Sequence, residues 1–114
     1  MPRRYRIRPG AVPRGRLSVP GDKSITHRAL LLGALAAGET EIRGPNGGAD
    51  CLATAAALRA LGVPIEERRE GWTVRGRDGV LHAPAEALDL GNSGTGARLL
   101  AGVLAGQSFE AVLT

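Results

Sequence analysis

The sequence PGDKSITHRAL, residues 20–30, decides the fold of this chain because it marks the start of a helix after an extended segment. The residues that follow are nearly all alanine and leucine and lead to Gly38. We therefore expect a buried helix at Ser24–Ala37, apolar on every side. On the other side, prolines at positions 2, 9 and 13 disfavour a helix. Residues 3–17 are predicted to be an extended basic arm.

Apolar periodicity and turn residues predict the elements that follow this helix. A second helix at Asp50–Leu61 has its apolar residues on one face and stops at Gly62 and Pro64. Two short runs around Glu70-Gly71 predict a hairpin of strands Ile65–Arg69 and Trp72–Arg75. The remaining expected elements are the strands Thr40–Arg43, Ala87–Leu90 and Phe109–Leu113 and a third helix at Ser93–Leu104.

An internal repeat relates two parts of the chain at a spacing of 70 positions, which aligns Gly21 with Gly91 and Arg28 with Arg98. We therefore expect an α/β fold (α+β in some schemes) built from repeated β-α-β-α-β-β units. The arm of residues 1–17 precedes a first unit at residues 18–78, and residues 79–114 form about half of a second. Because such repeats usually continue until the core is closed, we expect the chain to belong to a longer protein.

Composition limits the kinds of partner. The net charge is +4 and the pI about 10.5, which favours anionic partners. Aromatic residues make up only 3% of the chain, too few for stacking on bases, so nucleic acid is not expected. Small phosphates and carboxylates remain. Of the 15 basic residues, Lys23 alone is lysine and the others are arginine.

The sequence also favours the cytoplasm as location. The single cysteine, Cys51, excludes an internal disulfide and suits a reducing compartment. No apolar segment follows the basic N-terminus, so no signal peptide is expected. No apolar run approaches the roughly 20 residues of a membrane span.

Residues at two helix starts are the candidate site. The first predicted helix carries Lys23, His27 and Arg28 in or beside its first turn, where the helix dipole disfavours cations. The third carries Arg98 after the glycine-rich stretch GNSGTG, residues 91–96. A bound anion would resolve both conflicts, because backbone N–H groups, dipole and cations would converge on it. Three hydroxyl groups could add donors, those of Ser24, Ser93 and Thr95.

Simpler interpretations of these residues stay open. Lys23 and Arg28 could lie on a solvated face, and residues 91–96 could form an ordinary strand-to-helix turn. His27 is expected to support the site rather than act as a base, and His82 to be solvated. The carboxylates are expected in capping or surface positions, with none placed to act as a base at the anion site; examples are Asp22, Glu39 and Asp50.

Several common site types do not fit. The two histidines and the cysteine share no metal-ligand spacing, so we expect no metal and no cofactor. Asp22 separates Gly21 from Lys23, so residues 21–24 are not a Walker A loop. The glycines of residues 91–96 are not spaced as G-x-G-x-x-G, which argues against a dinucleotide site.

The motifs PGDKSITHRAL (residues 20–30) and LGNSGTGAR (residues 90–98) resemble two signatures of the 5-enolpyruvylshikimate-3-phosphate synthase family. Asp50–Gly62 is similar to the helix between them. The resemblance covers Gly15–Thr114, or about the first quarter of a family member. Ser93 and Gly96 depart from it mildly, since alanine is common at both positions. The family's aspartate base and several phosphoenolpyruvate arginines would lie beyond Thr114.

The resemblance implies a two-domain enzyme, expected to be a monomer, in which residues 1–17 belong to the other domain. It implies transfer of the enolpyruvyl group of phosphoenolpyruvate to shikimate 3-phosphate, without cofactor, and a chain that is inactive by itself. Lys23 would be catalytic and touch both substrates, and Ser24 and Arg28 would bind shikimate 3-phosphate. The phosphoenolpyruvate side would comprise Gly94, Asn92 and Thr95, with Asp22, His27 and Arg98 as supporting residues.

Two alternatives remain at this stage. The sister enzyme that acts on a UDP-amino sugar (UDP-N-acetylglucosamine) usually has Gly-Ala-Lys-Asn-Ala where this chain has Gly21–Ile25. The other alternative is a non-catalytic module that binds anions or nucleic acid. The sequence that follows residue 114 would separate this module from the enzyme.

Overall fold

The computed structural model describes all residues, 1–114, and contains three helices and three strands. The helices are α1 (Lys23–Leu35), α2 (Ala49–Ala60) and α3 (Gly94–Ala105). The strands are β1 (Glu39–Arg43), β2 (Ile65–Arg68) and β3 (Gly71–Arg75). These elements confirm the α/β class, and their bounds lie within one or two residues of those expected.

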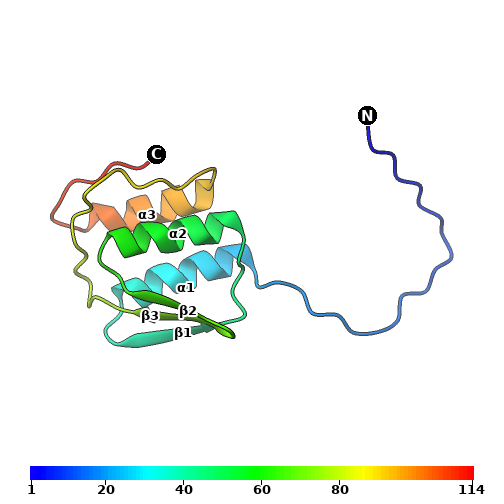
Figure 1. Ribbon diagram of the computed structural model, residues 1–114, viewed down its shortest axis with the longest axis horizontal. Coiled ribbons are helices and arrows are strands. Elements are labelled where there is room, and N and C mark those ends of the chain that lie inside the picture. The colour runs from blue at the N-terminus through cyan, green and yellow to red at the C-terminus, as the bar shows by residue number, and fades with distance from the viewer.

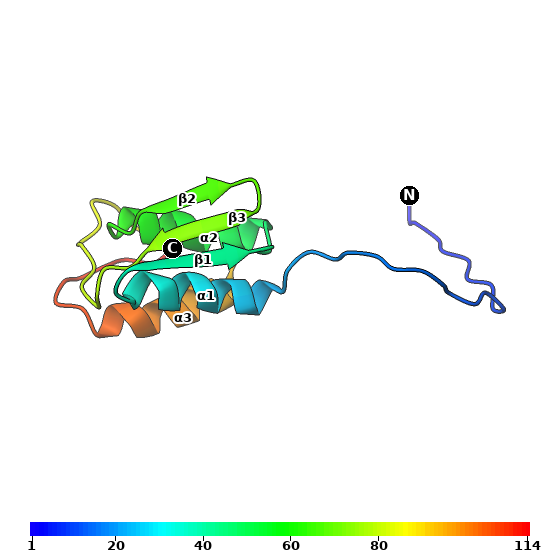
Figure 2. The same cartoon turned by 90° about the horizontal axis from the view of Figure 1, so that it is seen from below.

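The elements form layers, with the sheet on one side of α1 and α2 and with α3 on the other (Figures 1 and 2). The sheet is antiparallel in the order β1-β3-β2, and β3 pairs with both neighbours. All three helices run in the same direction and start at the end of the domain from which the N-terminal arm leaves (Figure 1). Their positive dipole ends therefore face the same side of the molecule.

One hydrophobic core joins the sheet and the three helices. Only one face of α1 belongs to this core, and the other face is exposed to solvent. Ile25 and Leu32 are both 68% exposed, so the expectation of a helix buried on every side was wrong. The Ala/Leu-rich composition hid this, because one face packs on α2, α3 and the sheet while the other has nothing beside it. The largest fully buried apolar side chains are Leu30, Leu58, Leu61, Leu90 and Leu100, with Val63 and Val74.

The strands expected at Ala87–Leu90 and Phe109–Leu113 are reduced to one parallel bridge between Leu88 and Leu113. The two segments exchange backbone hydrogen bonds there, including Thr114 N–H to the Leu88 carbonyl at 2.9 Å. A parallel pair without a third strand offers few ladder bonds, and this is why no regular sheet extends along either segment.

The N-terminal arm forms no helix or strand before α1, as predicted for residues 3–17. Figure 1 shows it leading away from the folded part. The first strand of a β-α-β-α-β-β unit is therefore not formed, since no strand lies beside the arm to pair with it. None of the helices is both long enough and apolar enough to cross a membrane.

Candidate functional site

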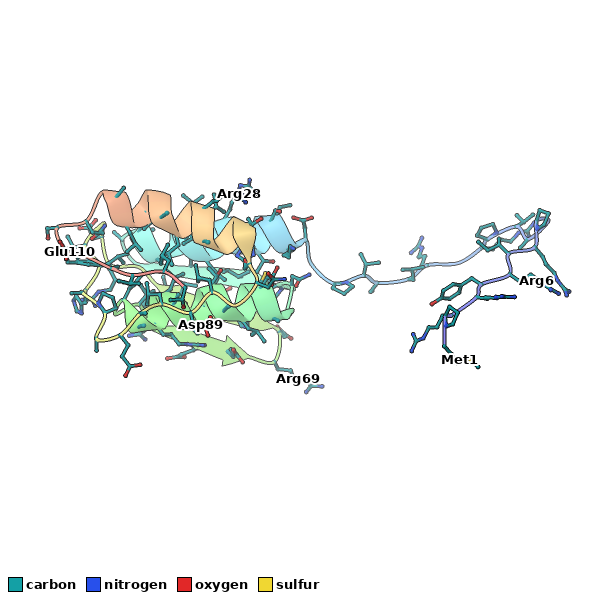
Figure 3. The ribbon with its side chains drawn as sticks, turned by 90° about the horizontal axis from the view of Figure 1, so that it is seen from above. Met1, Arg6, Arg28, Arg69, Asp89 and Glu110 are labelled. Atoms are coloured by element: carbon teal, nitrogen blue, oxygen red, sulfur yellow. The ribbon has the colours of Figure 1, made fainter.

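The starts of α1 and α3 bring the predicted site residues to one end of the domain. We call residues Gly21–Arg28 the α1 start and residues Gly91–Arg98 the α3 start. Figure 3 places Arg28 at this end, from which the arm also leaves, and Glu110 at the opposite end. The first backbone N–H groups of a helix lack intrahelical acceptors, so this end presents unpaired donors together with positive dipoles.

The α1 start is capped and then clamped from outside. The Asp22 carboxylate accepts a hydrogen bond from Ile25 N–H at 2.8 Å, which confirms its capping position. The amide of Asn46, in the loop between β1 and α2, donates to the Gly21 carbonyl at 2.9 Å. The Asn46 backbone N–H also donates to the Thr26 hydroxyl at 3.0 Å. One residue of a distant loop thus contacts both sides of the first helical turn.

Gly21 is required here by close approach rather than by an unusual dihedral angle. A Cβ at this position would lie 2.2 Å from the Gly44 carbonyl oxygen and 3.1 Å from Asn46 N. Both are backbone atoms that no side-chain rotation can move. The absence of a side chain therefore lets the α1 start contact the loop that carries Asn46.

Lys23 is the first residue of α1, and its ammonium lies 3.2 Å from the Asp50 carboxylate in the first turn of α2. Asp50 was expected only in a capping or surface position, and its pairing with Lys23 was not predicted. Because α1 and α2 start at the same end, their first turns are neighbours in space, although 27 positions separate the two residues. The Lys23 side chain is 52% exposed, so the ammonium still reaches solvent.

Ser24 and Arg28 share the outer side of the same helical turn. The Arg28 guanidinium donates to the Ser24 carbonyl at 3.2 Å, and Arg28 is exposed while Ser24 is half-buried. The structure thus brings Lys23, Ser24 and Arg28 together within the first two turns of α1. Two cations and a hydroxyl group accompany the positive end of the helix.

His27 points inward and is fully buried. Its Nδ1 lies 2.9 Å from the Thr54 hydroxyl of α2, and its Nε2 has no hydrogen-bond partner. Burial lowers the pKa of His27 from its usual 6.5, with Lys23 and Arg28 adding to the effect and Asp50 opposing it. The imidazole of His27 therefore lies buried at the junction of α1 and α2.

The α3 start is shaped by its own neighbours in the sequence. Asp89 accepts from Gly91 N–H at 2.8 Å, and Gly91 has φ +58°, which a side chain would strain. Ser93 is the N-cap, accepts from Gly96 N–H at 3.0 Å and is buried. The Ser93 hydroxyl accepts in this cap, so its own O–H remains the donor that the sequence led us to expect.

The other predicted residues of the α3 start lie nearer the surface. Asn92, Gly94 and Arg98 are exposed, and Thr95 is half-buried. A Cβ on Gly94 would lie 3.1 Å from Arg98 Nη1, so the guanidinium lies over the first turn of α3. A cation beside unpaired N–H groups at a glycine-lined turn can bind an anion there.

The contacts of two residues with the α1 start were not predicted from the sequence. Asn46 lies in the stretch Pro45–Gly48, which has the composition of an ordinary turn, and no local signal marks its contacts. Cys51 donates its thiol to the Lys23 carbonyl at 3.6 Å, and burial, together with Asp50, raises the pKa of the thiol. No group of three or more His, Cys, Asp or Glu side chains is arranged to hold a metal ion.

Lys23, Arg28, Asn92 and Arg98 are exposed, so the side chains at the two helix starts reach solvent. A hollow of about 360 Å³ lies elsewhere, beside the hairpin between Arg43 and Trp72. Its arginines include Arg43 and Arg68, which are already paired with Glu41 and Glu66 at 3.2 and 3.1 Å. The chemistry-bearing residues therefore gather at the helix starts and not in this hollow.

The sequence of the chain is similar to known proteins over almost its whole length. The family model for EPSP synthase (3-phosphoshikimate 1-carboxyvinyltransferase) matches residues 7–114 and thus includes part of the arm. The 3-phosphoshikimate 1-carboxyvinyltransferase of Alkalilimnicola ehrlichii is 56% identical over 112 residues, which is 96% of this chain and 25% of that protein. The protein of the same name from Halorhodospira halophila is 56% identical over 113 residues, with the same two shares.

The fold is similar to that of a solved structure, the EPSP synthase from Acinetobacter baumannii. The TM-score is 0.82 at 48% sequence identity, over 88% of this chain and 23% of that one. The chain spans about a quarter of the length of the curated relatives it matches. Two motifs at adjacent helix starts, a matching fold and a family model over nearly all residues agree, and the chain belongs to the EPSP synthase (3-phosphoshikimate 1-carboxyvinyltransferase) family.

Proposed function

We propose that this chain is the N-terminal part of a 3-phosphoshikimate 1-carboxyvinyltransferase. The enzyme would transfer the enolpyruvyl group of phosphoenolpyruvate to the 5-hydroxyl of shikimate 3-phosphate and release phosphate, on the route to chorismate and aromatic amino acids. The observation that carries the proposal is the only lysine of the chain at the first position of a helix, beside Ser24 and Arg28. Membership of the family supports the choice of reaction.

The reaction needs positive charge more than it needs a reactive side chain. In the addition step, C3 of phosphoenolpyruvate gains a proton, and the 5-hydroxyl of shikimate 3-phosphate loses its proton as its oxygen bonds to C2, which gives a tetrahedral ketal phosphate. Elimination then breaks the C2–O bond to phosphate and removes a proton from C3, which restores the vinyl ether. The substrates bring two phosphates and two carboxylates, so cations and N–H donors must surround them.

The two helix starts would divide this work. Lys23 would contact both substrates, since its ammonium is exposed at the α1 start. Ser24 and Arg28 would bind shikimate 3-phosphate from the same turn. Gly94 would admit phosphoenolpyruvate to the α3 start, with Asn92 and Thr95 in the same loop. Asp22 and His27 would support the α1 start through the cap and the buried contact with Thr54, and Arg98 would support the α3 start.

The chain alone is not expected to catalyse the transfer. The two carboxylates at the α1 start are already engaged, Asp22 in the helix cap and Asp50 with Lys23. The helix starts are also open to water, which weakens every electrostatic interaction with a bound anion. A cytoplasmic location is proposed from the buried free thiol of Cys51, which suits a reducing compartment.

A segment exchange tests the proposal. The matching N-terminal segment of the Acinetobacter baumannii enzyme is replaced by this chain, and phosphate release is measured with phosphoenolpyruvate and shikimate 3-phosphate. We expect turnover that Lys23→Ala removes, and no turnover from the 114-residue chain alone. A folded hybrid that is inactive with shikimate 3-phosphate but active with a UDP-amino sugar would replace the proposed acceptor. A hybrid inactive with both would overturn the proposal.

The order of binding can be tested on the chain itself. Because Lys23, Ser24 and Arg28 lie together in the first two turns of α1, shikimate 3-phosphate should bind in the millimolar range, or about 4 kcal/mol. Amide signals of the α1 start should shift first in an NMR titration. Equal or earlier shifts at Asn92–Gly96 with phosphoenolpyruvate would contradict this order.

A further inference from the structure

We infer that Asp50 is a positioning residue for Lys23, an inference that rests on the proposed function of the α1 start. The Asp50 carboxylate would take one of the three N–H donors of the ammonium and direct the other two toward the space in front of the helix starts. The anionic groups of the substrates would bind in that space.

Lys23 is held at both ends by two consecutive residues of α2. Asp50 contacts its ammonium at 3.2 Å, and the Cys51 thiol donates to its backbone carbonyl at 3.6 Å. Asn46 contacts the carbonyl of Gly21 two residues earlier at 2.9 Å. The direction of the Lys23 side chain is therefore set by α2 and its preceding loop, because nothing within α1 contacts the ammonium.

Asp50 is the more fixed member of the pair. Its side chain is 30% exposed against 52% for Lys23. It lies in the first turn of α2, where the helix dipole favours a negative charge. The first turn of α1, by contrast, holds no acidic side chain. The carboxylate of the α1 start, Asp22, is engaged in the cap with Ile25 N–H, so Asp50 supplies the carboxylate that pairs with Lys23.

Two possible roles of this carboxylate predict opposite effects on ligand binding. An ammonium has three donors and no acceptor, so one bond to Asp50 leaves two donors for two anions. A negative charge beside a phosphate site also repels the ligand. If Asp50 acted through its charge alone, removing that charge would strengthen the binding of every anion. If Asp50 orients Lys23, its removal should weaken the binding of a ligand that needs a defined geometry.

Because Lys23 is the only lysine, its side chain gives a single signal in the 114-residue chain labelled with ¹³C-lysine. We expect Asp50→Asn to lower the order parameter of Cε into the flexible range, below about 0.6, without any ligand present. The matched control is Glu39→Gln, which breaks the Glu39–Arg75 pair of 3.1 Å at the other end of the sheet. An unchanged order parameter in Asp50→Asn would overturn the inference.

Titration with shikimate 3-phosphate gives the second measurement. Asp50→Asn should weaken binding about threefold to fivefold, the size expected for an exposed ion pair, while Glu39→Gln should leave it unchanged. Asp50→Glu keeps the charge but moves the carboxylate by one methylene group, and it should restore only part of the affinity. Tighter or equal binding in Asp50→Asn would overturn the inference.

The two measurements separate failure of the inference from failure of the proposed function. Absence of shikimate 3-phosphate binding by the wild-type chain would count against the proposed function. The order parameter in the ligand-free chain would then decide the role of Asp50 by itself. The amide spectrum of each variant shows whether the variant is folded. If Asp50→Asn does not fold, Asp50→Glu provides the test instead.

Discussion

The α1 start and the α3 start occupy related positions in the internal repeat but are held in place differently. At the α1 start, Asn46 and Asp50 contact residues 25 and 27 positions away. At the α3 start, Asp89 and Ser93 contact residues only two and three positions away. The α1 start is thus shaped by other elements of the fold, and the α3 start by its own turn.

This difference predicts how each part of the site responds to change. A substitution at the α1 start disturbs the contact of α1 with α2 and so affects the whole domain. A substitution at the α3 start disturbs one local turn. The loss in the free energy of unfolding should therefore stay near the contribution of the hydrogen bond that is removed. Each prediction below compares the two, from the largest expected effect to the smallest.

Gly21→Ala should have the largest effect, a loss of about 3 kcal/mol in the free energy of unfolding. The new Cβ would lie 2.2 Å from the Gly44 carbonyl, and a backbone atom can move only with its loop. At the α3 start, Gly91→Ala should lower the free energy of unfolding by about 1 kcal/mol, because the φ of +58° strains a residue with a side chain. A Cβ there would meet no other atom within 4 Å, so no clash adds to this loss. Urea denaturation measures both.

The control for Gly21→Ala is Gly47→Ala, in the loop that Gly21 contacts. A Cβ on Gly47 would meet no atom within 4 Å, and its φ is ordinary, so stability should change little. The comparison between the two starts would be broken if Gly91→Ala cost as much as Gly21→Ala.

Lys23→Arg should lower kcat/KM of the hybrid enzyme about 10²-fold, nearly as much as Lys23→Ala. Lysine is a compact point charge with three rotatable donors, whereas arginine is a planar fork that prefers a flat, bidentate partner. The guanidinium is wider than the ammonium, so between Asp50 and the two packed substrates it should displace one of the substrates. The three proteins are compared at fixed ionic strength. If Lys23→Arg keeps more than about a third of the activity, less than about 1 kcal/mol is lost and the lone lysine has no special role.

The sequence predicts local features of the fold and of the site well. Every helix and the hairpin were placed within one or two residues, because composition and turn residues mark their ends. The capping position of Asp22 also follows from helix rules. The prediction of a strand at Phe109–Leu113 was wrong, because apolar composition does not tell whether another strand is present to pair with this segment.

The contacts between distant residues could not be predicted. Asn46 and Asp50 act on the α1 start across more than 20 positions, and only the packing of α2 against α1 brings them there. The capping contact of Ser93 with Gly96 was not predicted either, because the sequence does not fix which residue of GNSGTG, residues 91–96, begins α3.

Asn46→Ala should destabilise the domain more than Ser93→Ala does. Asn46→Ala removes two hydrogen bonds of the Asn46 side chain. Its NH₂ group donates to the Gly21 carbonyl and its oxygen accepts from Gly48 N–H, so we expect a loss of about 2 kcal/mol in the free energy of unfolding. Ser93→Ala removes one N-cap bond, worth about 1 kcal/mol. Denaturant midpoints of both variants give the comparison. Equal losses would mean that the Asn46 contacts stabilise the α1 start no more than a local cap would.

The smallest effect is expected where the two starts share a contact. The Thr54 hydroxyl lies 2.9 Å from His27 Nδ1 of the α1 start, and a Cβ on Gly96 of the α3 start would lie 2.9 Å from the same hydroxyl. Burial lowers the pKa of His27, so the folded chain keeps the imidazole neutral while the unfolded chain takes up a proton below about pH 6.5. Stability should therefore be fully present above this pH and fall as the pH is lowered.

For one proton the slope cannot exceed about 1.4 kcal/mol per pH unit, and urea denaturation between pH 7.5 and 5.5 measures it before most carboxylates titrate. His27→Asn should flatten this dependence. His82→Gln, at an exposed histidine, is the matched control in which the His27 slope should persist. If protonation loosens the shared contact, amide signals of both starts should broaden together at low pH. An unchanged slope in His27→Asn would assign it to other groups, and broadening confined to the α1 start would show that Thr54 does not couple the two.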